Sequence, residues 1–366
     1  MRLVVTGGGT GGHVYPAIAV ANAWMGIGPD HDALFVGAEG GMEARAAHAA
    51  GLPFEGIAAT KLPPHFGPAT FRALAATLRG TLQARRALVR ARPAAVVSTG
   101  GYAGAAAACA AITMRVPVVL VEPNAVAGRA TRWLGRWARR VCVAFEEAAA
   151  WFPRERTIVT GAPIRAGIVS RVDEGSARAH FGLPGEGIVL LVVGGSQGAR
   201  TLNQAVAGAL SALPEAVAVL HQTGLTDAEE ARARAAAAGL APPRYVARTY
   251  LELADMPLAY AAASLVFCRC GASSLAEATA NGLPAIMTPL PTAFADHQTA
   301  NARSLVRAGG GVLLAQRDLT PERLAEIAWG IAGDRERLRA MSDASRAVGR
   351  PDAADRVARV AQEVAR

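Results

Sequence analysis

Two glycine-rich loops, each following a short apolar run and preceding a helical stretch, constrain this 366-residue chain more than any other feature. The first occupies residues 7–13 (GGGTGGH) and the second residues 194–199 (GGSQGA). A strand, a glycine turn and a helix in this order open a doubly wound α/β domain, and the chain is long enough for two such domains. We therefore predict two doubly wound α/β domains with parallel sheets, one after the other.

Short apolar runs alternate with helical stretches along both halves, as expected for parallel strands that are buried on both faces. We place the domain boundary after residue 162, so that 1–162 form the first domain and 163–349 the second, and we expect a helix in 350–366 to pack back on the first. The predicted strands beyond those before the two loops are 34–36, 95–98, 118–121, 141–143, 158–160, 218–221, 244–246, 265–268 and 285–288.

The net charge of +9 is unevenly distributed. Residues 56–145 hold thirteen basic residues and one acid, Glu122, so this region carries 13 − 1 = +12 and the rest carries 9 − 12 = −3. A basic region of this kind indicates an anionic partner, either lipid headgroups or nucleic acid. Arginine-rich helices without a specific partner would give the same count.

The four cysteines are scattered and lack metal-ligand spacing, which argues against a metal site or disulfide framework and favours a reducing compartment. Asp30-His31-Asp32 precedes a predicted strand, so we interpret it as a surface turn. The first residues run directly into a strand and do not form a signal peptide. No stretch of 18 apolar residues predicts a transmembrane helix.

The first loop has the chemistry of a phosphate site. Its glycines fit GxGxxG and let backbone N–H groups approach a phosphate at a helix N-terminus. A tight turn without a ligand has the same glycines, and a dehydrogenase using Glu39 stays open. His13, at the positive end of the helix, favours its neutral form and is a candidate base, although it could simply hydrogen-bond the loop.

Three groups of polar residues follow strands in the second half. Ser196 lies in the second loop, and residues 268–277 (CRCGASSLAE) combine the end of a strand with the start of a helix. Ser273 and Ser274 can hold a phosphate there, and Glu277 can accept ribose hydroxyls, unless it is a buried acid paired with an arginine. Residues 296–301 (DHQTAN) supply amides that can read sugar hydroxyls.

The order GGTGGH, GGY, a loop ending in Asn, GGSQGA, CRxGAxxxxE and DHQxxNA, from Gly7 to about Ala302, resembles the MurG family. Its members transfer N-acetylglucosamine (GlcNAc) from UDP-GlcNAc to undecaprenyl-linked lipid I, which gives lipid II for peptidoglycan. The resemblance implies a GT-B fold with two Rossmann-like domains facing a cleft, inversion at the sugar carbon, and neither metal nor cofactor.

The resemblance also implies roles for individual residues. His13 would be the catalytic base, and Arg269 would stabilise the leaving group. The residues implied for the donor are Thr10, Gly11, Gly12, Asn124, Arg165, Ser196, Leu251, Ser273, Ser274, Glu277 and Gln298, with Leu253 as an alternative to Leu251. The residues implied for the acceptor are Gly9, Thr10, His13, Gly100, Gly101 and Tyr102.

The chain departs from the family pattern mainly on the acceptor side. Val121, Pro123 and Gly104 stand where the family usually has His, Gln and Ser, and Ala295 replaces a common Asp. The departures leave open a GT-B transferase with another lipid or small-molecule acceptor. A non-enzymatic nucleotide-sugar or nucleic-acid binder is disfavoured, because no nucleic-acid module or aromatic stacking run is present.

A lipid acceptor would explain the basic region. Residues 71–92 place leucines on one helical ridge among arginines, and residues 129–140 add five arginines with Trp133 and Trp137 one turn apart. Arginines beside exposed apolar side chains suit an anionic membrane surface. The two tryptophans could equally lie in the core. We expect a peripheral enzyme on the cytoplasmic face of the bacterial inner membrane.

Overall fold

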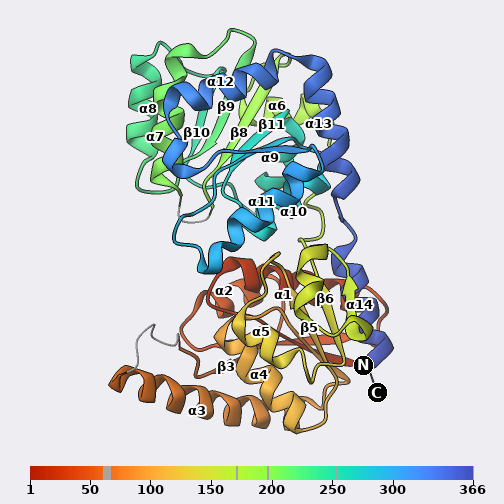
Figure 1. Cartoon of the computed structure of the whole chain (residues 1–366). Coiled ribbons are helices and arrows are strands. Elements are labelled where there is room, and N and C mark those ends of the chain that lie inside the picture. Colours follow the sequence, from red (N-terminus) through yellow and green to blue (C-terminus); the bar gives the residue numbers. More distant parts are fainter. Residues whose placement is uncertain (61–66, 170–171, 196–197, 253, 366) are drawn as a thin grey trace. The chain divides into compact units, whose positions relative to one another are not determined.

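The chain folds into two α/β units, each with its own parallel sheet, which confirms the predicted fold class (Figure 1). The computed structural model describes residues 1–60, 67–169, 172–195, 198–252 and 254–365. The first unit contains Met1–Ala166 and Arg350–Arg366, and the second contains Gly167–Gly349. The division thus falls slightly beyond residue 162.

The sheet of the first unit has the strand order β3-β2-β1-β4-β5-β6-β7, and its pairs are parallel. This is the order of a Rossmann sheet with an added edge strand, and loops that follow neighbouring strands meet at one edge of such a sheet. The strands are β1 (Arg2–Thr6), β2 (Asp32–Ala38), β3 (Phe54–Ile57), β4 (Ala95–Ser98), β5 (Val118–Glu122), β6 (Arg140–Val143) and β7 (Thr157–Val159).

Helices cover both faces of this sheet. Alternate residues of β1 point to opposite faces: Val4 packs with α3 and α4, whereas Leu3 and Val5 pack with α1 and α14. Both clusters are rich in Val and Ala. The helices are α1 (Gly11–Met25), α2 (Met42–Ala49), α3 (Pro68–Ala91), α4 (Gly101–Thr113), α5 (Arg129–Leu134) and α14 (Ala353–Val364), with the short helices η1 (Glu146–Trp151) and η2 (Arg154–Arg156).

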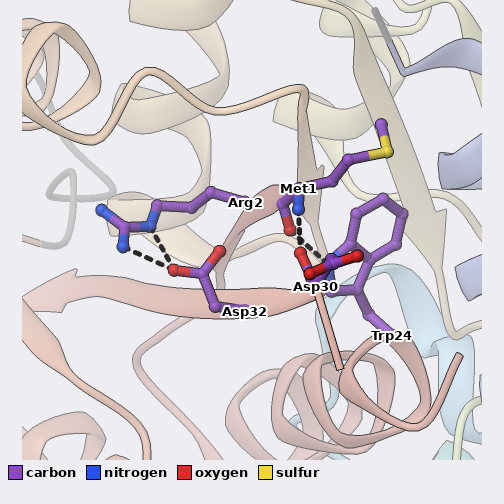
Figure 2. A network of polar contacts seen from close by, with 5 residues as sticks. All are labelled: Met1, Arg2, Trp24, Asp30 and Asp32. Carbon is purple, nitrogen blue, oxygen red and sulfur yellow. Dashed lines mark hydrogen bonds and ion pairs between the residues drawn. The ribbon is translucent and has the colours of Figure 1, made fainter. Parts of the chain in front are cut away.

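Hydrogen bonds hold the amino-terminal end of β1, which is the end far from the glycine loop (Figure 2). The Met1 amino group donates to the Asp30 carbonyl, and Trp24 Nε1 donates to the Met1 carbonyl at 3.3 Å. Arg2 Nε donates to Asp32 Oδ2 at 2.7 Å. Asp32 is the first residue of β2, so it is not part of the predicted surface turn. Asp30 does lie in a turn.

Helix α14 belongs to the first unit although it comes from the end of the chain. It packs against α1, and Val357, Ala358 and Ala361 are fully buried in the same core as Leu3 and Val5. Its apolar residues recur at helical spacing on one face, and packing against α1 buries that face.

The second unit repeats the plan with the strand order β10-β9-β8-β11-β12-β13, again with parallel pairs. Its strands are β8 (Ile188–Val193), β9 (Val217–Gln222), β10 (Tyr245–Arg248), β11 (Leu265–Cys268), β12 (Ala285–Met287) and β13 (Gly311–Leu313). Its helices are α6 (Glu174–Phe181), α7 (Arg200–Ala209), α8 (Ala228–Ala237), α9 (Asp255–Ala262), α10 (Ala272–Ala280), α11 (His297–Arg307), α12 (Pro321–Ala332) and α13 (Arg335–Val348), with the short helices η3 (Leu210–Ala212), η4 (Phe294–Asp296) and η5 (Gln316–Asp318).

Within the part of the chain that the structure describes, no helix has both the length and the apolar character needed to cross a membrane.

Candidate active site

The first glycine loop joins β1 to α1 and is anchored by a buried acid. The Gly9 N–H donates to Oε1 of Glu43 at 2.8 Å, and only 1% of Glu43, in the first turn of α2, is exposed. Gly9 has a φ of +85°, which glycine adopts without the steric cost that other residues meet. Gly9, Thr10 and Gly12 are exposed. The backbone of the loop is therefore held in place at Gly9, and a ligand can reach its exposed residues.

His13 lies in the first turn of α1, and the carbonyl of Thr99 fixes the orientation of its ring. Nδ1 of His13 lies 2.7 Å from the Thr99 carbonyl oxygen, and the Thr99 hydroxyl donates to the His13 carbonyl at 2.6 Å. Because a carbonyl oxygen only accepts, Nδ1 carries the hydrogen, and in the neutral ring the lone pair is on Nε2. This is the tautomer in which Nε2 acts as a base.

The loop before α4 packs directly on the first glycine loop. A Cβ on Gly101 would lie 2.1 Å from the Gly8 carbonyl oxygen, and a Cβ on Gly100 would lie 3.3 Å from Nδ1 of His13. Both glycines have positive φ angles, +99° for Gly100 and +78° for Gly101. Tyr102 follows with 39% of its side chain exposed. The structure thus brings together the two loops that carry the residues implied for the acceptor.

A second buried acid organises the loop that contains Asn124. Glu122 ends β5 and is 2% exposed; its Oε1 accepts from the Asn124 N–H at 3.1 Å, and its Oε2 accepts from the Gly128 N–H at 2.9 Å. Burial raises the pKa of Glu122, and these hydrogen bonds oppose the rise. Asn124 is half-buried, and Glu122 fixes its backbone.

The three acceptor-side departures from the family pattern are all buried. Val121 is fully buried in the core beside α14, and Pro123 follows Glu122 below the surface. A Cβ on Gly104 would lie 2.9 Å from the Ser98 hydroxyl, so that Ser98 already occupies the space a side chain at 104 would need. The departures therefore alter the packing beneath the loops.

The second glycine loop is held at both ends by residues at the end of β9. Nε2 of Gln222 donates to the Gly195 carbonyl at 3.0 Å, and a Cβ on Gly198 would lie 2.6 Å from the Thr223 carbonyl oxygen. Ser196 and Gln197, which the sequence singles out, lie outside the described residues. Helix α7 begins directly after the loop, and no side chain caps its N-terminus.

Helix α10 offers a better-defined place for a phosphate. Its N-terminus has no side-chain cap, and Ser273 and Ser274 lie in its first turn. The Ser273 hydroxyl is buried, and no described residue partners it. Buried hydroxyls are nearly always hydrogen-bonded, so one left over beside free helix N–H groups suits a ligand oxygen.

Arg269 stands just before α10. Its Nη1 donates to the carbonyls of Thr288 and Pro289 at 3.3 and 3.1 Å, which orients the guanidinium at the end of β12. Burial lowers the pKa of Arg269, but a guanidinium remains charged in proteins.

Glu277 and Gln298 are also held in defined orientations. The Tyr260 hydroxyl donates to Oε2 of Glu277 at 3.0 Å, one turn into α10. Oε1 of Gln298 accepts from the Leu290 N–H at 2.9 Å. Asn301 is fully buried and donates to the Cys270 carbonyl at 3.1 Å, so it braces α11 against the strand end.

Two other residues implied for the donor have different surroundings. Arg165 belongs to the first unit, where its guanidinium lies 5.4 Å from the centre of the Tyr15 ring. Leu251 is 2% exposed, so its side chain is part of the core of the second unit, and Leu253 lies outside the described residues. Thr10, Gly11, Gly12 and Asn124 lie in the first unit.

Comparison with known proteins shows the family to which the chain belongs. Residues 3–143 match the glycosyltransferase family 28 N-terminal domain, and residues 189–357 match the glycosyltransferase family 28 C-terminal domain. A UDP-N-acetylglucosamine–N-acetylmuramyl-(pentapeptide) pyrophosphoryl-undecaprenol N-acetylglucosamine transferase from Desulforudis audaxviator is 39% identical, with 100% of this chain and 99% of the relative covered. The transferase of the same name from Mycolicibacterium vanbaalenii is 42% identical, with 100% and 90% covered.

Solved structures agree as well. The crystal structure of Acinetobacter baumannii MurG is 30% identical with a TM-score of 0.79, and 99% of each chain is covered. A UDP-GlcNAc 2-epimerase from Neisseria meningitidis shares the fold at 12% identity and a TM-score of 0.71, with 99% of this chain and 100% of the other covered. From the two domain matches and the full-length relatives, the chain belongs to glycosyltransferase family 28 and, within it, to the MurG transferases.

Proposed function

We propose that this chain transfers GlcNAc from UDP-GlcNAc to undecaprenyl-linked lipid I and so makes lipid II. The observation that carries the proposal is the similarity over the full length to transferases with this activity in their names. The fixed tautomer of His13 supports it, because glycosyl transfer needs a base for the acceptor hydroxyl. The unsatisfied Ser273 hydroxyl supports a phosphate-bearing donor.

The second unit binds the donor. The N-terminus of α10, with Ser273 and Ser274, holds the diphosphate, and Glu277 accepts hydrogen bonds from the ribose. Gln298 and Ser196 contact the sugar and the nucleotide.

In the reaction, an acceptor hydroxyl oxygen bonds to C1 of GlcNAc while the bond from C1 to the β-phosphate oxygen breaks. The proton passes to Nε2 of His13, and UDP departs with the electron pair. Because the acceptor oxygen attacks the face of C1 opposite to UDP, the configuration at C1 inverts. Negative charge grows on the departing diphosphate, where the positive end of α10 and the guanidinium of Arg269 stabilise it. The loops of Gly9–Thr10 and Gly100–Tyr102 orient the acceptor.

The membrane partner is an anionic lipid surface. Helix α3, along the lower edge of Figure 1, exposes Phe71, Leu74, Leu78 and Leu82 to between 50% and 64%. Exposed arginines flank this apolar ridge, and each adds about 1 kcal/mol of attraction to an anionic leaflet. Trp133 and Trp137 are 52% and 49% exposed and contact each other edge to face, so neither is a core residue. We propose a peripheral enzyme on the cytoplasmic face of the inner membrane, and these exposed side chains support its contact with the lipid surface.

The test of the reaction is transfer of labelled GlcNAc from UDP-GlcNAc to a lipid I analogue, with EDTA present. We expect labelled lipid II. Bound UDP-GlcNAc without product would instead mean that the altered packing around Val121, Pro123 and Gly104 selects another acceptor. Product that disappears with EDTA would contradict a metal-independent reaction.

The test of the membrane surface is sedimentation with vesicles that contain anionic phospholipid. Leu78→Glu should lower the bound fraction several-fold, because it places a charge on the exposed ridge. Leu225→Glu is the matched control, since Leu225 is an exposed leucine (86%) in the second unit. Equal binding by both variants would remove α3 from the proposal.

A further inference from the structure

A buried polar network that the proposed reaction does not use joins β9 to the start of α7 in the second unit. Its centre is His221 on β9, which is fully buried. Nδ1 of His221 lies 2.8 Å from the Tyr245 hydroxyl, and Nε2 lies 2.9 Å from Oδ1 of Asn203.

The direction of each hydrogen bond follows from chemistry. Asn203 donates through Nδ2 to the Thr223 carbonyl at 2.7 Å and to Oδ2 of Asp227 at 2.8 Å, so its Oδ1 is an acceptor. Nε2 of His221 therefore carries hydrogen, and Nδ1 accepts from the Tyr245 hydroxyl. Burial lowers the pKa of His221 to about 3, which keeps the ring neutral and this single pattern in place.

The network ties the end of β9 to the start of α7. Asn203 lies in the first turn of α7, and the carbonyl it binds belongs to Thr223, directly after β9. The same Thr223 carbonyl is the atom that Gly198 packs against, so any Cβ at 198 would lie 2.6 Å from it. A shift of Thr223 would therefore move the exit of the glycine loop.

The neighbouring residue holds the other end of the loop. Gln222 is 3% exposed, and its Nε2 donates to the Gly195 carbonyl at 3.0 Å. Gly195 has a φ of +91°, so its carbonyl points where an ordinary residue would rarely place it. The contact holds this carbonyl toward the end of β9.

We propose that His221, Gln222 and Thr223 are positioning residues that fix Gly195 and Gly198 for binding of the donor. His221 fixes the Thr223 carbonyl through Asn203, and Gln222 fixes the Gly195 carbonyl directly. These residues do not touch substrate; they act through the loop. The inference rests on the proposed assignment of the donor to the second unit.

The main test is Gln222→Met, which keeps the side-chain length and removes the donor to Gly195. Losing one buried hydrogen bond that shapes a binding loop should raise the KM for UDP-GlcNAc by about tenfold. We expect kcat and the KM for the lipid I analogue to stay within about twofold, because the acceptor and the base lie elsewhere.

The matched control is Ser342→Ala, which also removes one hydrogen bond of the second unit. Ser342 donates to the Gly282 carbonyl at 2.6 Å, beyond the far end of α10. It should leave the KM for UDP-GlcNAc unchanged. An equal KM rise in Ser342→Ala, or an unchanged KM in Gln222→Met with a lowered melting temperature, would mean that Gln222 has only a structural role and would overturn the inference.

Glu277→Gln separates this inference from the donor assignment. If Glu277→Gln raises the KM for UDP-GlcNAc and Gln222→Met does not, the positioning role is refuted and the donor assignment stands. If neither variant changes that KM, the assignment of the donor to the second unit fails first.

Discussion

The two glycine loops occupy the same place in their sheets, after β1 and after β8, but opposite chemistry anchors them. In the first unit a buried carboxylate, Glu43, accepts from the Gly9 N–H; in the second a carboxamide, Gln222, donates to the Gly195 carbonyl. The first loop also ends in a histidine with a fixed tautomer. A loop beside an acid and a base suits movement of a proton, whereas the amide that holds the second loop is neutral and does not titrate.

The largest expected effect is a kinetic difference between the two units: a variant in the first should lower kcat, and a variant in the second should raise the KM for UDP-GlcNAc. His13→Ala removes the proposed base and should lower kcat by about 10²- to 10⁴-fold, with little change in the KM for UDP-GlcNAc. Ser273→Ala, in the second unit, should instead raise that KM by about tenfold with a smaller effect on kcat. Steady-state kinetics with both substrates varied measures the split. Unchanged turnover in His13→Ala would leave the first loop without a catalytic role.

The next largest effect should follow from disrupting the contact between the Gly100–Tyr102 loop and the first glycine loop, which has no counterpart in the comparison with the second unit above. Gly101→Ala places a Cβ 2.1 Å from the Gly8 carbonyl oxygen, so the two loops must separate. We expect the free energy of unfolding to fall by about 3 kcal/mol and transfer to be largely lost. Chemical denaturation and the transfer assay measure the two effects.

Gly40→Ala is the control for backbone conformation. Gly40 also has a positive φ, +72°, but a Cβ there meets no atom within 4 Å. It should cost only about 1 kcal/mol and leave transfer intact. Similar losses in both variants would mean that φ strain, and not contact between the loops, explains the Gly101 result.

Lowering the pH should change the free energy of unfolding in opposite directions through His221 of the second unit and Glu122 of the first. His221 has a pKa of about 3 in the fold against 6.5 when unfolded, so below pH 6.5 the unfolded state binds a proton that the native state excludes. Its contribution is complete above pH 6.5 and is lost as the pH falls toward 3, by about 1.4 kcal/mol per pH unit where the difference is one proton. Glu122, whose pKa burial raises, has the opposite sign, because the native state of the first unit gains protons more readily.

Urea unfolding between pH 7 and 4.5 checks this difference. His221→Gln keeps a donor for Asn203 and an acceptor for Tyr245 but does not titrate, so the pH slope of stability should become shallower than in the unaltered chain. Parallel slopes for the two proteins would show that His221 is not protonated on unfolding in this range.

The smallest effect concerns strain before α11. Ala295 and Asp296 both have positive φ angles, +47° and +52°, which are unfavourable for residues with a Cβ. Ala295→Gly should stabilise the second unit by about 0.5 to 1 kcal/mol, since relief of strain exceeds the added freedom of the unfolded chain. A shift of the urea midpoint to lower concentration would show that the turn gains from the methyl group.

The sequence predicts the central strands and the edge strands β7 and β10, but it misses the other two edge strands. The runs 95–98 and 265–268 coincide with β4 and β11, because strands buried on both faces are continuous apolar runs. β3 and β13 were not predicted. Each is an edge strand whose residues are mostly half-buried, so neither produces such a run.

The site divides in a similar way. Glycine loops and serines at helix starts are local patterns, so they can be read from the sequence. Glu43 and Gln222 were missed because each acts on a loop 34 or 27 residues away, and neither lies in a recognisable motif. A buried acid in the Ala-rich α2 carries no signal until the fold places it beside Gly9.

The return of α14 to the first unit has a consequence for synthesis. A ribosome delivers residues 167–349 before residues 353–364, so the second unit has its whole sequence in hand while the first still lacks one helix. Until α14 emerges, the apolar surface of α1 that Val357 and Ala361 cover faces water. The first unit is thus synthesised first but completes its core last. We expect chaperones to bind mainly to this unit during synthesis.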